Sequence, residues 1–133
     1  MKILVTGANG QLGREFARQG SEHDTLRVVH DQVGTPTSTV DLAQVIFRLI
    51  ASDAYGTYHA TCQGQCSWYE FACEIFHQTG KNVKVIPVTT SEFPRPAKRP
   101  MHSVLDNYML RMTVGDPMRK WQDALGEYLL KRK

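Results

Sequence analysis

A glycine-rich turn directly behind a short apolar strand constrains this chain more than any other feature. Residues Ile3–Val5 are apolar, and Gly7, Gly10 and Gly13 follow at once. Glycines allow the backbone to approach an anion closely, and the free N–H groups at the start of the following helix attract a phosphate. The pattern therefore predicts a strand, a turn and a helix that bind a nucleotide pyrophosphate. A tight turn without a ligand is the alternative.

The rest of a dinucleotide site is missing from the sequence. Such a site needs a second strand about 20 residues further on, ending in an acidic residue or an arginine that reads the ribose. Asp24 lies before the next predicted strand and not after it. Arg14 lies on the predicted first helix, where a solvated side chain is the alternative to contact with a 2′-phosphate.

Composition and charge exclude several classes of protein. The chain has 133 residues, 41% of them hydrophobic and 22% charged, which suits one folded domain with a modest core. A net charge of +3 is small for a nucleic-acid binder, so we expect no nucleic-acid partner. No apolar run reaches the length of a membrane span, and the first residues lead into the glycine turn and not into a signal-peptide core. We therefore expect a cytoplasmic protein with no membrane partner.

The three cysteines are Cys62, Cys66 and Cys73. An odd number fits a reducing compartment better than a disulfide framework. Their spacing lacks a paired C-x-x-C signature, and His59 and His77 are the nearest histidines that could share a metal. We expect structural thiols and no metal site.

Hydrophobic periodicity and punctuating residues predict the remaining elements. Strands are expected at residues 25–30, 57–61 and 83–88, and amphipathic helical pieces at 105–112 and 117–130. A run with three prolines at residues 93–100 predicts an extended loop.

Two helices have clear sequence signals. Thr39 is the expected N-cap of a helix that continues to about residue 51. Its apolar residues recur at helical spacing, at Val40, Ala43, Ile46, Phe47 and Ile50. Ser67 begins another helix with Glu70 as the partner in a capping box, and Gly80 ends it. We expect Trp68 and Trp121 to be core residues on their helices, and Asp106 to cap a helix that begins near Asn107.

Three segments, in chain order, resemble one known family. They are Val28–Thr37 (VVHDQVGTPT), Cys66–Ala72 (CSWYEFA) and Arg95–Asp106 (RPAKRPMHSVLD). Together they make residues 25–130 similar to the C-terminal part of the dTDP-4-dehydrorhamnose reductases. Residues 1–20 resemble the start of an extended short-chain dehydrogenase/reductase. The resemblance implies that the middle of the family's chain is missing near residues 20–24.

This resemblance implies an α/β fold: a partial Rossmann-like nucleotide-binding unit at residues 1–20, and a small C-terminal α/β substrate-binding lobe at residues 21–133. The family's oxidoreductases transfer hydride from NADPH or NADH to the C4 keto group of dTDP-4-dehydro-L-rhamnose. The product, dTDP-L-rhamnose, serves polysaccharide biosynthesis. The implied partners are a dTDP-sugar nucleotide and a second copy of the chain in a homodimer. In some family members the helix face of Glu15 helps to bind Mg²⁺ at the dimer contact, and a solvated glutamate is the alternative.

The resemblance also assigns site residues. Backbone groups of Gly10, Gln11 and Leu12, within the turn from Gly7 to Gly13, would contact the cofactor pyrophosphate. The loop of Gly34, Thr35 and Pro36 faces the sugar nucleotide in the family, although a purely structural role is the alternative. Arg99 and Ser103 lie on the proline-rich loop, where a guanidinium can grip a diphosphate. A solvated basic loop is the alternative there.

The catalytic pair of the family is absent. Carbonyl reduction needs a proton donor at the developing alkoxide, and the family supplies it with a Tyr-x-x-x-Lys pair. None of the five tyrosines, Tyr55, Tyr58, Tyr69, Tyr108 and Tyr128, is followed four positions later by lysine. No catalytic residue is therefore assigned, and we expect this chain alone to be a weak or inactive reductase. The alternatives are a non-catalytic sugar-nucleotide-binding or regulatory module and an internally deleted product without activity.

The predicted first strand also lacks its family neighbours. In the family's sheet these neighbours lie in the missing portion, and a parallel strand needs cover on both sides. We expect residues 3–6 to pair with residues 57–61, or the chain to associate with another to cover them.

Overall fold

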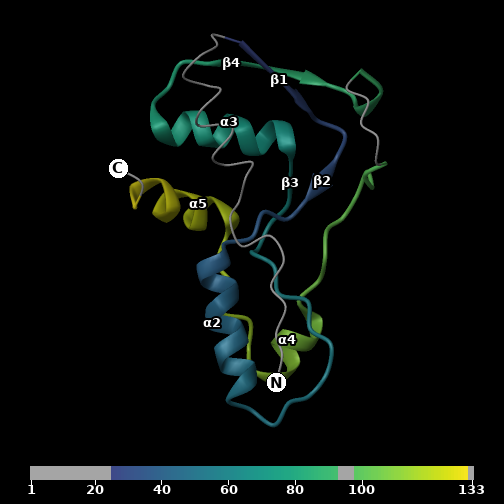
Figure 1. The fold of residues 1–133 in the computed structure, drawn as a ribbon, viewed down its shortest axis with the longest axis vertical. Coiled ribbons are helices and arrows are strands. Elements are labelled where there is room, and N and C mark those ends of the chain that lie inside the picture. Colours follow the sequence, from purple (N-terminus) through teal and green to yellow (C-terminus); the bar gives the residue numbers. More distant parts are fainter. Residues whose placement is uncertain (1–24, 93–97, 132–133) are drawn as a thin grey trace.

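The computed structural model describes residues 25–92 and 98–131 (Figure 1). The glycine turn, the predicted first strand and helix, the domain boundary at residue 20 and part of the proline-rich loop lie outside these residues. The described elements are, in chain order, β1 (Thr25–Val29), β2 (Val33–Gly34), α2 (Thr39–Ile50), β3 (Cys66–Ser67), α3 (Trp68–Thr79), β4 (Lys84–Val88), a 3-10 turn (Thr90–Glu92), α4 (Tyr108–Thr113) and α5 (Trp121–Leu130). The protein is thus an α/β structure, as the sequence predicts.

One end of the molecule is a two-stranded parallel sheet covered by α3 (Figure 1). Strand β1 pairs with β4 from Thr25 opposite Lys84 to Val29 opposite Val88. Beneath the strands, a small cluster of buried side chains joins the sheet to the helix, formed by Leu26, Val28, Ala72 and Phe76. The predicted strands at 25–30 and 83–88 are confirmed.

Helix α3 follows its local sequence signals closely. The Ser67 hydroxyl accepts a hydrogen bond from the Glu70 backbone N–H, and the Glu70 carboxylate accepts one from the Ser67 backbone N–H at 2.6 Å. Gly80 ends the helix with a φ of 66°, a left-handed conformation that glycine adopts without a steric penalty. The predicted capping box and helix end are confirmed.

A second, larger core lies between α2, α3, α4 and α5. Its most deeply buried side chains include Val45, Ile75, Leu110 and Met118. Trp121 is buried here at 5% exposure, as expected, and packs against Phe71 with ring centroids 5.7 Å apart. Trp68 is only half-buried and packs on the smaller cluster beneath β1.

Helix α2 begins at another cap than predicted. Its N-cap is Ser38 and not Thr39, because the Ser38 side chain is the one that accepts from the Asp41 backbone N–H. The apolar stripe that predicted the helix does not form the core, since Val40 and Phe47 are exposed while Val45 is buried. Periodicity located the helix but not its buried face.

The predicted strand at residues 57–61 is wrong as a paired strand. These residues belong to neither of the two sheets among the described residues, which contain β1 with β4 and β2 with β3. The physical reason is that a strand needs a neighbour to form its ladder of hydrogen bonds, and the described chain provides none here.

Helix α4 begins at Tyr108, and its N-cap Asn107 makes no side-chain capping bond. Asp106 pairs with Arg111 at 2.7 Å and is not the predicted cap. In the part of the chain that the structure describes, no helix is both long and apolar enough to cross a membrane.

Candidate functional site

Two adjoining cavities lie where β2, β3 and the segment before α4 meet. Strand β2 pairs antiparallel with β3, Val33 opposite Ser67 and Gly34 opposite Cys66. On its other side, Val33 donates its N–H to the Met101 carbonyl at 2.8 Å and accepts at its own carbonyl from the Ser103 N–H at 2.9 Å. Three chain segments far apart in sequence therefore converge, and Thr35, Thr61 and Leu105 line both cavities.

The smaller cavity, of about 210 Å³, has an aromatic wall. Trp68 and Phe71 line it with their rings edge to face at 6.5 Å, and Pro36 and Ser103 also line it. Gly34 also lines it, and a Cβ at this position would lie 3.0 Å from Ser103 Oγ. The close approach of β2 to the Ser103 segment therefore depends on a residue without a side chain.

The larger cavity, of about 330 Å³, has a polar wall from the loops around Gln63 and Asn107. The buried Asn107 amide fixes this wall: its Oδ1 accepts from the Thr61 N–H at 2.9 Å, and its Nδ2 donates to the Thr61 carbonyl at 2.8 Å. Nδ2 also lies 3.2 Å from an Asp116 carboxylate oxygen. The hydrogen bond from the Arg111 guanidinium lowers the pKa of Asp106, which keeps that carboxylate ionised at the rim.

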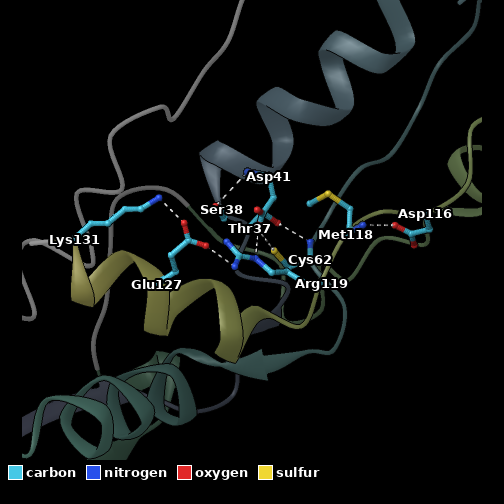
Figure 2. Close-up of polar contacts among 9 residues, drawn as sticks. All are labelled: Thr37, Ser38, Asp41, Cys62, Asp116, Met118, Arg119, Glu127 and Lys131. Atoms are coloured by element: carbon cyan, nitrogen blue, oxygen red, sulfur yellow. Dashed lines mark hydrogen bonds and ion pairs between the residues drawn. The ribbon is translucent and has the colours of Figure 1, made fainter.

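A chain of polar contacts fixes the loop that carries Thr35 and Pro36 (Figure 2). Thr37 Oγ1 donates to the Thr35 carbonyl at 3.1 Å and accepts from the Cys62 N–H at 3.4 Å. One turn further on, Asp41 Oδ2 accepts from Arg119 Nε at 2.8 Å. The loop therefore has anchors on two other segments of the chain.

Arg119 carries this connection into helix α5. Its Nη1 lies 2.5 Å from Glu127 Oε2, and Lys131 pairs with the same carboxylate (Figure 2). These two cations lower the pKa of Glu127, and the hydrogen bonds to Asp41 and Glu127 raise the pKa of Arg119. The Arg119 backbone carbonyl also accepts from the Gln63 N–H at 2.8 Å, so this residue connects a segment that lines the larger cavity to the start of α2 and to α5.

The thiols near the cavities are structural in character. All three cysteines are free, and Cys62 and Cys66 are buried. Burial raises the pKa of both thiols, that of Cys66 to about 12, so they stay protonated and unreactive at neutral pH. Among the described residues, no group of three or more His, Cys, Asp or Glu side chains could hold a metal ion.

The structure brings together four of the five predicted substrate-binding residues. Gly34, Thr35, Pro36 and Ser103 all line the smaller cavity, whereas Arg99 is exposed and lines neither cavity. The contact of Arg99 with a diphosphate stays a prediction. The predicted cofactor-binding residues Gly7, Gly10, Gln11, Leu12 and Gly13 lie outside the described residues, as does Glu15.

Sequence reasoning missed Asn107, Asp116 and Arg119. Asn107 meets Thr61 across 46 positions, and Arg119 meets Asp41 across 78. The local sequence around a single polar residue does not indicate which distant residue it will bond to in the folded chain.

The lining supports binding better than proton transfer. It combines an aromatic wall with amide, hydroxyl and carboxylate groups, which suits a ligand with a flat ring and several hydroxyl groups. Neither cavity has a tyrosine, lysine or histidine among its described lining residues.

Comparisons with known proteins agree on one family. Residues 15–133 match the model of the RmlD substrate binding domain. The chain is 43% identical over 107 residues to the spore coat polysaccharide biosynthesis protein SpsK of Bacillus subtilis, covering 80% of this chain and 37% of that protein.

Two solved structures are similar in fold and sequence. A dTDP-4-dehydrorhamnose reductase from Clostridium acetobutylicum is 58% identical with a TM-score of 0.89, over 91% of this chain and 44% of that one. The dTDP-4-dehydrorhamnose reductase from Bacillus anthracis, in complex with NADP, is 38% identical with a TM-score of 0.86, over 92% of this chain and 43% of that one. The chain thus spans about two fifths of the length of these relatives.

Proposed function

The chain belongs to the RmlD substrate-binding domain family, and from this premise we propose that it binds the sugar nucleotide for a dTDP-4-dehydrorhamnose reductase. The single observation that carries the proposal is the cavity where Gly34, Thr35, Pro36 and Ser103 meet the aromatic wall of Trp68 and Phe71. A thymine base can stack on such a wall, and the polar groups of the adjoining cavity can bind sugar hydroxyls.

The complete reaction is an NADPH-dependent reduction of the 4-keto group of dTDP-4-dehydro-L-rhamnose. We place this chain in that reaction as the part that holds the substrate, with residues 21–133 as the binding lobe. The cofactor and the proton donor belong to the remaining part of such an enzyme. Accordingly, the chain mixed with NADPH and dTDP-4-dehydro-L-rhamnose should oxidise no more NADPH than a blank without protein.

The test is a calorimetric titration of the chain with dTDP-L-rhamnose, dTDP and UDP-glucose. We expect saturable binding of the first two with one site per chain, and weaker binding of UDP-glucose. Absence of heat with dTDP-L-rhamnose, for a chain that gives a folded circular dichroism spectrum, would contradict the proposal.

A matched pair of variants locates the site. Leu105 lines both cavities and is 46% exposed, whereas Leu130 on α5 is 68% exposed and lines neither. Leu105→Arg should lower the affinity for dTDP-L-rhamnose at least tenfold because the longer charged side chain occupies the shared opening. Leu130→Arg makes the same chemical change elsewhere and should leave the affinity unchanged.

A non-catalytic binding or regulatory module is the second candidate function, favoured by the missing proton donor. It predicts the same titration but no activity when the nucleotide-binding part of a reductase is added. The homodimer, its Mg²⁺ and the cytoplasmic location stay predictions.

A further inference from the structure

The larger cavity has one cationic side chain among its described lining residues, Arg111 of α4. Two carboxylates, those of Asp106 and Asp116, line the same cavity, and the smaller cavity has no charged side chain in its described lining. The described lining of the two cavities together therefore carries more negative than positive charge. A sugar nucleotide has a negatively charged diphosphate bridge at neutral pH, so its binding here needs a cation close to that bridge.

The turn of α4 that carries Arg111 is firmly anchored. Leu110, the residue before it, is fully buried in the larger core. The Arg111 backbone N–H donates to the Asn107 carbonyl at 3.0 Å, and the Asn107 side chain bonds to both backbone groups of Thr61. The backbone of Arg111 is therefore fixed relative to the cavity wall, which reduces the entropy lost when a ligand binds.

In the described part of the chain, the Arg111 guanidinium pairs with one carboxylate, which is exposed. Its Nη1 lies 2.7 Å from Asp106 Oδ1, and the two side chains are 46% and 68% exposed. An ion pair this exposed stabilises the fold little, because water solvates both charges when they separate. By contrast, Arg119 is bonded to both Asp41 and Glu127 and lines neither cavity. Of these two arginines, Arg111 is the one that can turn to a ligand with little loss of stability.

The order of groups in a sugar nucleotide matches the order of the two cavities. Its diphosphate lies between the nucleoside and the sugar. Thr35, Thr61 and Leu105 line both cavities, so a ligand with its base in the smaller cavity enters the larger one past these residues. Asn107 lines the larger cavity and bonds to Thr61, and Arg111 lies one helical turn beyond Asn107. One residue thus connects Arg111 to the shared boundary, and its long side chain can reach a diphosphate there.

On the basis of the proposed function, we propose that Arg111 binds the diphosphate of the sugar nucleotide, and that Asp106 pairs with the guanidinium when no ligand is bound. Binding exchanges one ionic partner for another, because the phosphate oxygens take the place of the Asp106 carboxylate. A guanidinium donates through several N–H groups in one plane, so it can bind two phosphate oxygens at once. Arg111 thereby favours a nucleotide-linked sugar over the free sugar, which offers no anion.

The experiment is a calorimetric titration of the full chain and its variants with dTDP-L-rhamnose. Arg111→Met should lower the affinity by about tenfold or more, because it removes a charge-assisted contact. Arg48→Met is the matched control: it makes the same change at an exposed position of α2 that lines neither cavity, and should leave the affinity unchanged. Arg99→Met tests the arginine of the proline-rich loop for the same contact, and should lower the affinity less than Arg111→Met.

Asp106→Asn separates contact with the ligand from a structural role of the ion pair. If the pair only holds the rim of the cavity in shape, its loss from either side should weaken binding. In our proposal Asp106 competes with the ligand, so Asp106→Asn should raise the affinity about two- to fivefold while Arg111→Met lowers it. Raising the salt concentration from about 50 to about 300 mM should weaken binding to the parent chain more than binding to Arg111→Met, because salt screens the ionic contact.

Three results would overturn this inference. They are equal affinities of the parent chain and Arg111→Met, equal losses in Arg111→Met and Arg48→Met, and a loss of affinity in Asp106→Asn. A loss confined to Arg99→Met would also overturn it and would assign the diphosphate to the proline-rich loop. All of these differ from failure of the proposed function, in which the folded parent chain itself gives no heat with dTDP-L-rhamnose.

Discussion

Residues 25–29 and residues 57–61 carry similar sequence signals but adopt different structures. Both are short runs in which alternate side chains are buried or partly buried. The first becomes β1, pairs with β4 and is covered by α3. The second has one face on a core and no paired neighbour in the described chain. The difference teaches that a strand signal reports a tendency, whereas the strand itself needs a neighbour with free backbone groups.

The helices beside these segments differ in the same way. Helix α3 covers β1 and β4 and buries Phe76 to 4% exposure. Helix α2 leaves Phe47 at 71% exposure. The sheet end therefore buries the aromatic ring of its helix, whereas α2 keeps an aromatic ring largely exposed.

The largest expected effect compares these two phenylalanines. Phe76→Ala should lower the free energy of unfolding by about 3–5 kcal/mol because it leaves a cavity between α3 and the sheet. Phe47→Ala should change it by less than about 0.5 kcal/mol because the ring is largely in solvent. Urea unfolding of both variants is the measurement, and equal losses would show that α2 is as fully packed as α3.

A smaller loss is expected where α5 anchors the start of α2. Arg119→Met should lower the free energy of unfolding by about 1.5–3 kcal/mol, because it removes the hydrogen bonds to the mostly buried Asp41 carboxylate. Arg27→Met removes an ion pair at the sheet end whose partners are each about half exposed, and should cost less. Both are measured by urea unfolding. An Arg27 loss equal to that of Arg119 would contradict the assigned role of burial.

The N-cap of α2 gives a sharper, local test. Ser38→Ala should cost about 1 kcal/mol because it removes the acceptor for the Asp41 N–H. Thr39→Ala, one residue on and exposed, should cost clearly less. Thermal unfolding of the two variants compares them, and the reverse order would place the helix start one residue later.

The smallest effect concerns pH at the sheet end. Hydrogen bonds from the Thr90 N–H and hydroxyl lower the pKa of Asp31. Since the folded pKa lies below the unfolded one, the stabilisation is complete above the ordinary aspartate range near about pH 4 and is lost as pH falls through the lowered value. Urea midpoints measured from pH 6 to pH 2.5 should fall less steeply for Asp31→Asn than for the parent chain. If the urea midpoints of the two proteins fall equally with pH, the Asp31–Thr90 hydrogen bonds are not a source of acid sensitivity.

Local sequence determined several features of this protein. The Ser67–Glu70 capping box and Gly80 bound α3 where predicted, since each acts within a few residues of the backbone that it satisfies. Apolar periodicity located β1, β4 and α2 for the same reason. The motifs around Gly34 and Ser103 also identified the family and four of the residues that line the smaller cavity.

Only the tertiary structure decided which faces are buried and which side chains meet. Three residues of the stripe that predicted α2, Val40, Phe47 and Ile50, are exposed, because burial depends on which neighbour is present and not on spacing within the helix. Asn107 with Thr61, and Arg119 with Asp41, are pairs of single polar residues from distant segments. A hydrogen bond needs two groups within about 3 Å, and chain folding alone brings such groups together.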